Sequence, residues 1–142
     1  GDFEADGLLD GWIRGEVDPG GSIRFEAEKE NIGTGTCALR ATIREPGAGG
    51  IIQRIVVTPG KRYEVSGILK SEGFKGEALI GFFTGRIGSW SGRSKPLRGD
   101  SDWRRVKFEW SPGQSRTTYL ACYIKGLEGT VWFDEIKFKE IP

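Results

Sequence analysis

Short strand-like segments recur along the whole chain, and this recurrence limits the possible folds more than any other feature. Within these segments apolar and polar residues alternate, and no segment shows the sustained 3.6-residue apolar period of an amphipathic helix. A parallel sheet needs helical crossovers between its strands, so the pattern excludes it. Two antiparallel sheets packed face to face bury the apolar faces that a single sheet would leave in water. We therefore predict an all-β fold, an antiparallel β-sandwich of the jelly-roll type, with strands at 22–27, 36–43, 50–57, 61–70, 77–84, 102–110, 117–125 and 130–139.

Turn-forming residues separate the expected strands. The chain has 23 Gly and 6 Pro among 142 residues, and they gather in turns such as Thr58-Pro59-Gly60 and Ser111-Pro112-Gly113. No linker and no internal repeat divides the sequence, so we expect a single domain over residues 1–142. Because the chain opens at Gly1-Asp2-Phe3 without methionine, we expect that this domain was excised from a larger multidomain protein.

Charge and composition exclude several functional classes. Lys and Arg total 21 against 20 Asp and Glu, a net charge of +1 that offers no overall attraction to nucleic acid or to an anionic membrane. Histidine is absent, which excludes Ser-His-Asp catalysis and imidazole metal sites. Two carboxylates can still catalyse glycoside hydrolysis, but no acidic pair stands out on the expected aromatic face. We therefore expect a binding domain and not an enzyme.

The two cysteines do not identify a cellular compartment. Cys37 and Cys122 are too far apart for a metal knuckle or a redox C-x-x-C motif, and both lie among apolar neighbours. Two buried free thiols and one disulfide between the sheets are both compatible with this pattern.

Alternation along the strands assigns side chains to the core or to the outer face. On 117–125, Leu120, Cys122 and Ile124 form the core row, which leaves Tyr119 and Tyr123 facing outward. Outward aromatic residues usually mark an interaction site, although an error in the phase of one strand would produce the same pattern. The other expected core residues are Tyr63, Val65, Leu69, Ala78, Ile80 and Phe82, with Phe83 on the outer face.

The chain has five tryptophans, and their surroundings differ. Trp103 and Phe133 lie among periodic apolar residues and are expected in the core, whereas Trp90 lies in Gly88-Ser89-Trp90-Ser91-Gly92 without such partners and is expected in solvent. An exposed aromatic ring on a rigid scaffold can stack on the apolar face of a sugar, while polar side chains bind the hydroxyls.

The segment from Arg86 to Arg105 carries six Lys and Arg against two Asp. This excess is compatible with binding an anionic polymer, and also with a solvated loop whose charge is balanced elsewhere.

Several short motifs, spread in order over the whole chain, resemble one superfamily. They are Asp2-Phe3-Glu4 with Gly11-Trp12, Gly35 with Ala38-Leu39-Arg40, Ile52-Gln53, Val57 to Tyr63, Ser66-Gly67 with Lys70, Asp102 to Val106, and Gly129 to Ile136. Together they are similar to the galactose-binding-domain-like carbohydrate-binding modules of families four, nine, sixteen and twenty-two. The resemblance implies a jelly roll with a structural calcium ion and a shallow concave face that binds β-linked glycans.

The resemblance implies the residues of both sites. For Ca²⁺ it implies Asp2, Glu4, Glu28 and Asp134, and the alternative for Glu4 and Asp134 is that they only form surface ion pairs. For the glycan, the resemblance and the assigned faces together suggest three groups of residues. They are Trp12 and Trp90 as stacking platforms, Tyr119, Tyr123 and Phe83 as the cleft floor, and Gln53, Arg54 and Lys70 as groups that bind hydroxyls. Trp12 is equally compatible with a core position. The arginine content of segment 85–101 is compatible with an acidic, uronate-containing glycan as well as a neutral one.

The sequence thus predicts a non-catalytic polysaccharide-binding module, secreted or at the cell surface. We expect a monomeric domain that targets a covalently linked glycoside hydrolase or lyase to a plant or microbial cell-wall glycan, with no nucleic acid or membrane partner. Two alternatives are a structural or protein-interaction sandwich of a cell-surface protein, and a small lyase or glycosidase.

Overall fold

The computed structural model describes residues 13–16, 23–28 and 38–142, and residues 13–16, 27, 28 and 38 as backbone only. Every regular element in this part is a β-strand, and all pairings are antiparallel, as the sequence predicts. Among the described residues no helix is long and apolar enough to cross a membrane. The strands are β1 (Ile13–Glu16), β2 (Ile23–Glu28), β3 (Ala38–Ile43), β4 (Gly47–Val56), β5 (Arg62–Phe83), β6 (Gly92–Arg93), β7 (Leu97–Arg98), β8 (Ser101–Trp110) and β9 (Thr117–Ile141).

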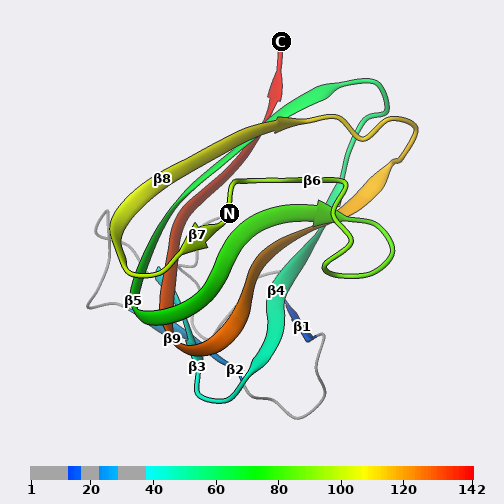
Figure 1. Ribbon diagram of the computed structural model, residues 1–142. Coiled ribbons are helices and arrows are strands. Elements are labelled where there is room, and N and C mark those ends of the chain that lie inside the picture. Colours follow the sequence, from blue (N-terminus) through cyan, green and yellow to red (C-terminus); the bar gives the residue numbers. More distant parts are fainter. Residues whose placement is uncertain (1–12, 17–22, 29–37) are drawn as a thin grey trace.

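Two long strands, β5 and β9, run through both layers of the sandwich (Figure 1). The second half of β5 pairs with the first half of β9, and together with β6, β7, β4 and β1 these halves form one layer, called sheet I. The first half of β5 pairs with the second half of β9, and these halves form sheet II with β8, β3 and β2. The domain is therefore a β-sandwich of the jelly-roll type whose two layers are continuous through two bent strands.

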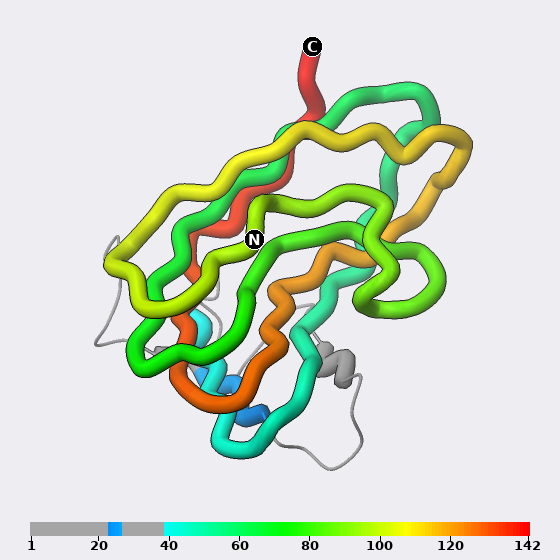
Figure 2. Tube along the Cα trace, viewed as in Figure 1, coloured from blue at the N-terminus to red at the C-terminus, as the bar shows by residue number. Residues whose placement is uncertain are grey.

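The bends of β5 and β9 lie side by side and form one glycine-rich corner (Figure 2). A Cβ atom on Gly76 would meet the backbone of Lys125 and Gly126, and one on Gly129 would meet the backbone of Phe74 and Gly73. Gly129 also has a φ of 119°, which L side chains rarely adopt. Only glycine allows the two backbones to approach this closely while both chains turn from one sheet into the other.

Hydrogen bonds to the turn between β7 and β8 stabilise this corner. The Ser71 hydroxyl donates to the Gly99 carbonyl at 2.6 Å, and the Phe74 amide donates to the Asp100 carboxylate at 2.9 Å. The second bond satisfies a backbone amide that the bend of β5 takes out of the regular ladder.

The core lies between the two sheets and confirms the predicted phase of the strands. Leu120, Cys122 and Ile124 of β9 are buried there, and so are all six of the other residues assigned to the core, from Tyr63 to Phe82. Sheet II contributes Leu39, Val131 and Phe133. Trp103 was expected in the core, but this prediction is wrong: it is half-buried outside the core cluster. Its neighbour Arg104 pairs with the core residue Leu69, so the alternation of β8 turns Trp103 to the outer face of sheet II.

Strand boundaries differ from the prediction at several places. Strand β1 was not predicted, and β4 begins three residues before the predicted segment 50–57. Segments 61–70 and 77–84 form one strand, β5, and segments 117–125 and 130–139 form one strand, β9. Glycine here bends the chain without ending its hydrogen-bond ladder, which the sequence pattern cannot distinguish from a turn. The segment 85–101, expected to contain no strand, includes the short edge strands β6 and β7.

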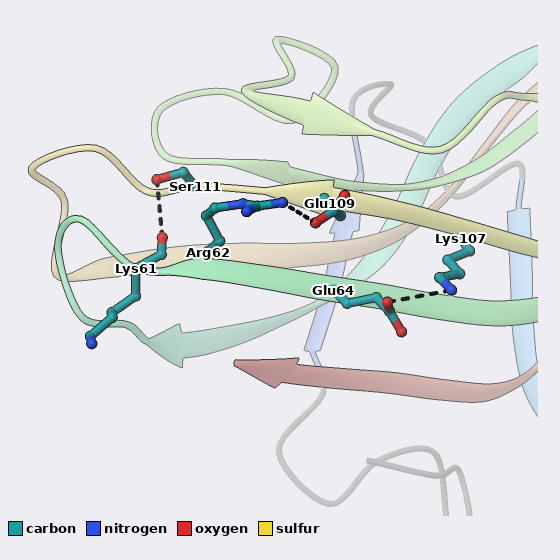
Figure 3. A network of polar contacts seen from close by, with 6 residues as sticks. All are labelled: Lys61, Arg62, Glu64, Lys107, Glu109 and Ser111. Carbon is teal, nitrogen blue, oxygen red and sulfur yellow. Dashed lines mark hydrogen bonds and ion pairs between the residues drawn. The ribbon is translucent and has the colours of Figure 1, made fainter. Parts of the chain in front are cut away.

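Exposed polar contacts tie β8, at the edge of sheet II, to β5 (Figure 3). Arg62 pairs with Glu109, Lys107 pairs with Glu64 at 3.4 Å, and the Ser111 hydroxyl donates to the Lys61 carbonyl at 3.0 Å. Exposed ion pairs contribute little stability each, so they mainly keep an edge strand charged and soluble.

Cys122 is a free, fully buried thiol in the core, while Cys37 lies outside the described residues. Burial raises the pKa of the Cys122 thiol far above its ordinary value of 9.0, because the thiolate would lose its hydration. The thiol therefore packs as a small apolar group.

This burial predicts a loss of stability at alkaline pH. The folded chain keeps the Cys122 proton while the unfolded chain releases it above about pH 9, so each further pH unit lowers the free energy of unfolding by up to about 1.4 kcal/mol. Below about pH 9 the stability that depends on the Cys122 proton is fully present. Urea titrations from pH 8 to 10.5 measure it, and Cys122→Ala should flatten the alkaline limb by that amount. An equally steep limb in the variant contradicts the assignment.

The corner predicts a sharp difference between two glycine substitutions. Gly76→Ala brings a Cβ against the backbone of β9 and should lower the free energy of unfolding by about 3 kcal/mol. Gly85→Ala is the matched control, because its Cβ would meet nothing within 4 Å and its φ is not positive. Equal melting temperatures for the two variants would show that the corner tolerates a side chain.

Candidate functional site

Four aromatic side chains gather on the outer face of sheet I. Phe83 and Tyr119 stack with ring centroids 5.3 Å apart, and Trp90 meets Tyr123 edge to face at 5.1 Å. Phe83 and Trp90 connect the two pairs at 6.0 Å. These four residues are called the aromatic cluster below. Phe83, Tyr119 and Tyr123 are the residues that alternation assigned to the outer face, and Trp90 is a predicted stacking platform.

The position of Trp90 depends on a glycine beneath it. Gly81 lies in β5 between Leu79 and Phe83, and a Cβ atom on it would come within 2.6 Å of the Trp90 ring. The Ser91 amide donates to the Phe82 carbonyl at 2.8 Å, which fixes the chain next to Trp90. The indole therefore lies flat on the backbone of the sheet.

The loop between β5 and β6 covers part of this face. Ile87 and Trp90 pack against a small apolar cluster made of Ala48, Leu79 and Tyr123, which is separate from the main core. Phe83 and Tyr123 are consequently only 5% and 6% exposed. The prediction that these rings face outward is confirmed, but the prediction that they face water is wrong, because a loop absent from the strand pattern closes over them.

Trp90 and Tyr119 remain half-exposed and are the accessible members of the cluster. Trp90 was expected in solvent, and the structure corrects this to a half-buried position on the sheet. Phe83 supports Tyr119 from the side and Tyr123 supports Trp90. The face thus has two accessible rings held in place by two buried ones.

Exposed arginines surround the aromatic cluster. Arg54 of β4 is the cross-strand partner of Tyr119, Arg93 of β6 is the partner of Gly81, and Arg86 lies in the covering loop. None of these three forms an ion pair with another residue that the structure describes. Their guanidinium groups are available as hydrogen-bond donors at the rim.

Two predicted glycan-binding residues lie away from the cluster. Gln53 pairs with the core residue Leu120, so it points to the opposite face of sheet I from Arg54. It lines a cavity of about 550 Å³ at one end of the sandwich, together with Ile136 and Phe138.

Lys70 belongs to sheet II and lies 5.2 Å from the ring centre of Trp132. It also pairs with Glu72 at 3.8 Å. The grouping of Gln53 and Lys70 with the aromatic residues is therefore corrected, because β4 alternates its faces and Lys70 lies in sheet II, before β5 enters sheet I.

The predicted calcium ligands are described only in part. Asp2 and Glu4 lie outside the described residues, and Glu28 is described as backbone only. Trp12, the other predicted stacking platform for the glycan, also lies outside the described residues. Asp134 is fully buried, and its carboxylate accepts a hydrogen bond from the Glu135 amide at 2.8 Å. Glu135 has a φ of 50°, at a bulge where β9 gains one residue relative to β5. Among the described residues no three His, Cys, Asp or Glu form a group that could hold a metal.

The arrangement on sheet I is suited to binding and orienting a flat ligand. Two accessible rings provide apolar planes, and the arginines provide donors at their edges. Such a combination matches the apolar C–H faces and the polar rim of a pyranose ring.

No family model and no curated protein matches the sequence, but solved structures match the fold. A CBM22-1 xylan-binding domain from Paenibacillus barcinonensis Xyn10C superposes with a TM-score of 0.68 at 16% identity, over 99% of this chain and 91% of that one. TmCBM61, solved in complex with β-1,4-galactotriose, gives 0.66 at 11% identity, over 92% and 88%. The CBM22-1–GH10 modules of Clostridium thermocellum Xyn10B, complexed with xylohexaose, give 0.65 at 13%, over 93% and 26%.

The fold is shared with carbohydrate-binding modules. The identities are low, so the likeness establishes the architecture that the resemblance implied and leaves the ligand to the residues of this chain. In this chain the aromatic cluster occupies the outer face of sheet I, opposite the core.

Sequence reasoning missed the residues that hold the cluster together. Gly81, Leu79 and Ile87 act through contacts between the loop and the sheet, and alternation in one strand gives no sign of such contacts. Arg93 could have been found, because the excess of arginine in its segment was visible in the sequence.

Proposed function

We propose that this protein is a non-catalytic polysaccharide-binding module whose glycan surface is built on Trp90 and Tyr119. The module holds a covalently linked glycoside hydrolase or lyase on a plant or microbial cell-wall glycan, outside the cell. Tethering raises the effective concentration of the enzyme at its substrate without any chemical step in the module itself.

The half-exposed pair of rings carries this proposal. Trp90 lies flat on the Gly81 backbone and Tyr119 stacks on Phe83, so both rings are held before a ligand arrives. Preorganised aromatic planes lose little conformational entropy on binding. Arg54 and Arg93, exposed at the rim, would donate hydrogen bonds to sugar hydroxyls.

The ligands of structurally similar domains support the choice of glycan. One similar domain is described as xylan-binding, a second was solved with β-1,4-galactotriose, and a third is joined to a GH10 module in a complex with xylohexaose. We therefore propose a β-1,4-linked polysaccharide of the xylan or galactan type as the ligand, and a catalytic domain as the covalent partner.

Trp90→Ala should strongly weaken glycan binding by the module. Removal of one accessible ring and its support on Tyr123 should weaken retention by about tenfold or more, because buried aromatic anchors dominate such interfaces. Affinity electrophoresis in gels containing xylan, galactan, β-glucan, mannan, cellulose or pectin measures the retention. Unaltered mobility of the unmutated protein in every gel would overturn the proposal.

Two further variants distinguish binding from folding. Trp103→Ala removes a half-buried indole from sheet II and should leave retention unchanged. Trp90→Phe keeps a ring on Gly81 and should restore part of the binding, whereas equal loss in Trp90→Phe and Trp90→Ala, with an unchanged melting temperature, would contradict stacking.

We also propose that a structural Ca²⁺ is bound by Asp134 together with Asp2, Glu4 and Glu28. Carboxylate and carbonyl oxygens are the ligands that Ca²⁺ prefers, and the ion would neutralise charge and join separate segments. Two observations support the fit. The Asp134 carboxylate offers oxygen ligands on β9, and Glu28 pairs with Ala38 on β3, the strand next to β9.

Chelation should lower the melting temperature by several degrees, and added Ca²⁺ should restore it. An ion that binds only the folded chain stabilises it by roughly 2.7 kcal/mol at a hundredfold excess over its Kd. Differential scanning calorimetry with EGTA, then with excess Ca²⁺, measures the shift. Asp134→Asn should lose the response while the exposed Asp102→Asn keeps it. If neither EGTA nor Ca²⁺ changes the melting temperature of the unmutated protein, the proposal of a structural ion is contradicted.

A further inference from the structure

A second cavity, separate from the aromatic cluster, lies at one edge of the sandwich. It has a volume of about 250 Å³ and opens between the segment before β7 and strand β8, where the edges of sheets I and II face each other. Pro96, Leu97 and Val106 provide its apolar lining, and Leu97 is fully buried.

Every charged residue that lines this cavity is a cation. They are Lys95, Arg104, Arg105 and Lys107. Arg105 pairs with Glu135 at 3.5 Å and Lys107 pairs with Glu64 at 3.4 Å, so two of the four charges are already compensated (Figure 3 shows the second pair). Lys95 and Arg104 form no ion pair with any residue that the structure describes, and they leave a net positive cavity.

Strand register directs Arg104 toward the gap between the sheets. Arg104 is the cross-strand partner of Leu69, and Val106 is the partner of Gly67, which faces the core residues Ile80 and Ile136. Directly paired residues of an antiparallel ladder share a face, so Arg104 and Val106 are on the inner side of β8. A cation at an inner position of an edge strand is suited to receive a ligand there, whereas Arg105 and Lys107 on the outer side serve the ion pairs of the edge.

We propose that this edge cavity binds the carboxylate of a uronic acid unit in an acidic polysaccharide. The Arg104 guanidinium can hold a carboxylate with two parallel hydrogen bonds, and the Lys95 ammonium adds a third donor. The apolar lining fits the C–H face of a sugar ring, and the volume is below the roughly 300–1,000 Å³ of pockets for larger ligands. The cavity therefore accepts one acidic sugar unit and not a long segment of chain.

The position of the cavity relates it to the aromatic cluster. Arg93 pairs with Gly81 beneath Trp90, and Lys95 follows two residues later along the same edge of sheet I. The choice of a polysaccharide over other carboxylates rests on the proposed function, since a glycan on sheet I would pass this edge. The binding chemistry of the cavity itself rests only on its own residues.

The test compares polygalacturonate with its carboxyl-reduced product, which has the same backbone without charges. The module should bind polygalacturonate at low salt and bind the reduced polymer at least about tenfold more weakly, since charge-assisted hydrogen bonds contribute most of the affinity. Lys95→Gln/Arg104→Gln should lose the binding to polygalacturonate by a similar factor, and 0.5 M NaCl should weaken it in the unmutated protein. Isothermal titration calorimetry measures each case, and dextran sulfate in a parallel titration distinguishes carboxylate from sulfate recognition.

Control variants separate this proposal from the function of the aromatic cluster. Arg44→Gln/Arg116→Gln removes the same charge from two exposed turn residues and should bind polygalacturonate normally. Trp90→Ala should keep most of the binding to polygalacturonate even where it loses binding to neutral xylan. Absence of binding to polygalacturonate, equal binding to the reduced polymer, stronger binding to dextran sulfate, or loss in Trp90→Ala but not in Lys95→Gln/Arg104→Gln would each overturn the proposal.

Discussion

The close approach of two backbones at the glycine corner is the constraint on which the rest of this fold depends. Gly76 and Gly126 allow β5 and β9 to remain paired while β5 turns from sheet II into sheet I and β9 turns from sheet I into sheet II. If either strand ended at the corner, a separate connection would have to join the two sheets. Each sheet would then lose the continuous β5–β9 pair at its centre. Because the ladder continues through the corner, the register in one sheet sets the register in the other, and with it the face on which Phe83 and Tyr123 lie.

The outer face of sheet I shows how a module can carry aromatic residues without an unprotected apolar patch. Leu79 and Tyr123 are covered by Ile87 and Trp90, and only Trp90 and Tyr119 keep accessible surface. The covering loop thus reduces the exposed apolar area and at the same time contributes one of the two accessible rings. The arginines at the rim keep this face hydrated and polar between the rings.

The sequence predicted contacts that depend on one strand and missed those that depend on two segments. Alternation was enough to assign Leu120 to the core and Tyr119 to the outer face, because the side-chain period of a strand is fixed. The same rule, applied strictly, would have separated Gln53 from Arg54. The packing of Trp90 on Gly81 and the continuity of β5 were not accessible, since both depend on how far glycine lets distant backbones approach.

The sharing of β5 and β9 by both layers has a consequence for how the molecule comes apart. Each sheet is built around one half of β5 and one half of β9, so neither layer can separate without disrupting two strands that continue into the other. Loss of one layer would uncover the inner face of the layer that remains, exposing core residues such as Leu39 of sheet II or Ile51 of sheet I to solvent. The domain therefore loses its structure as one cooperative unit.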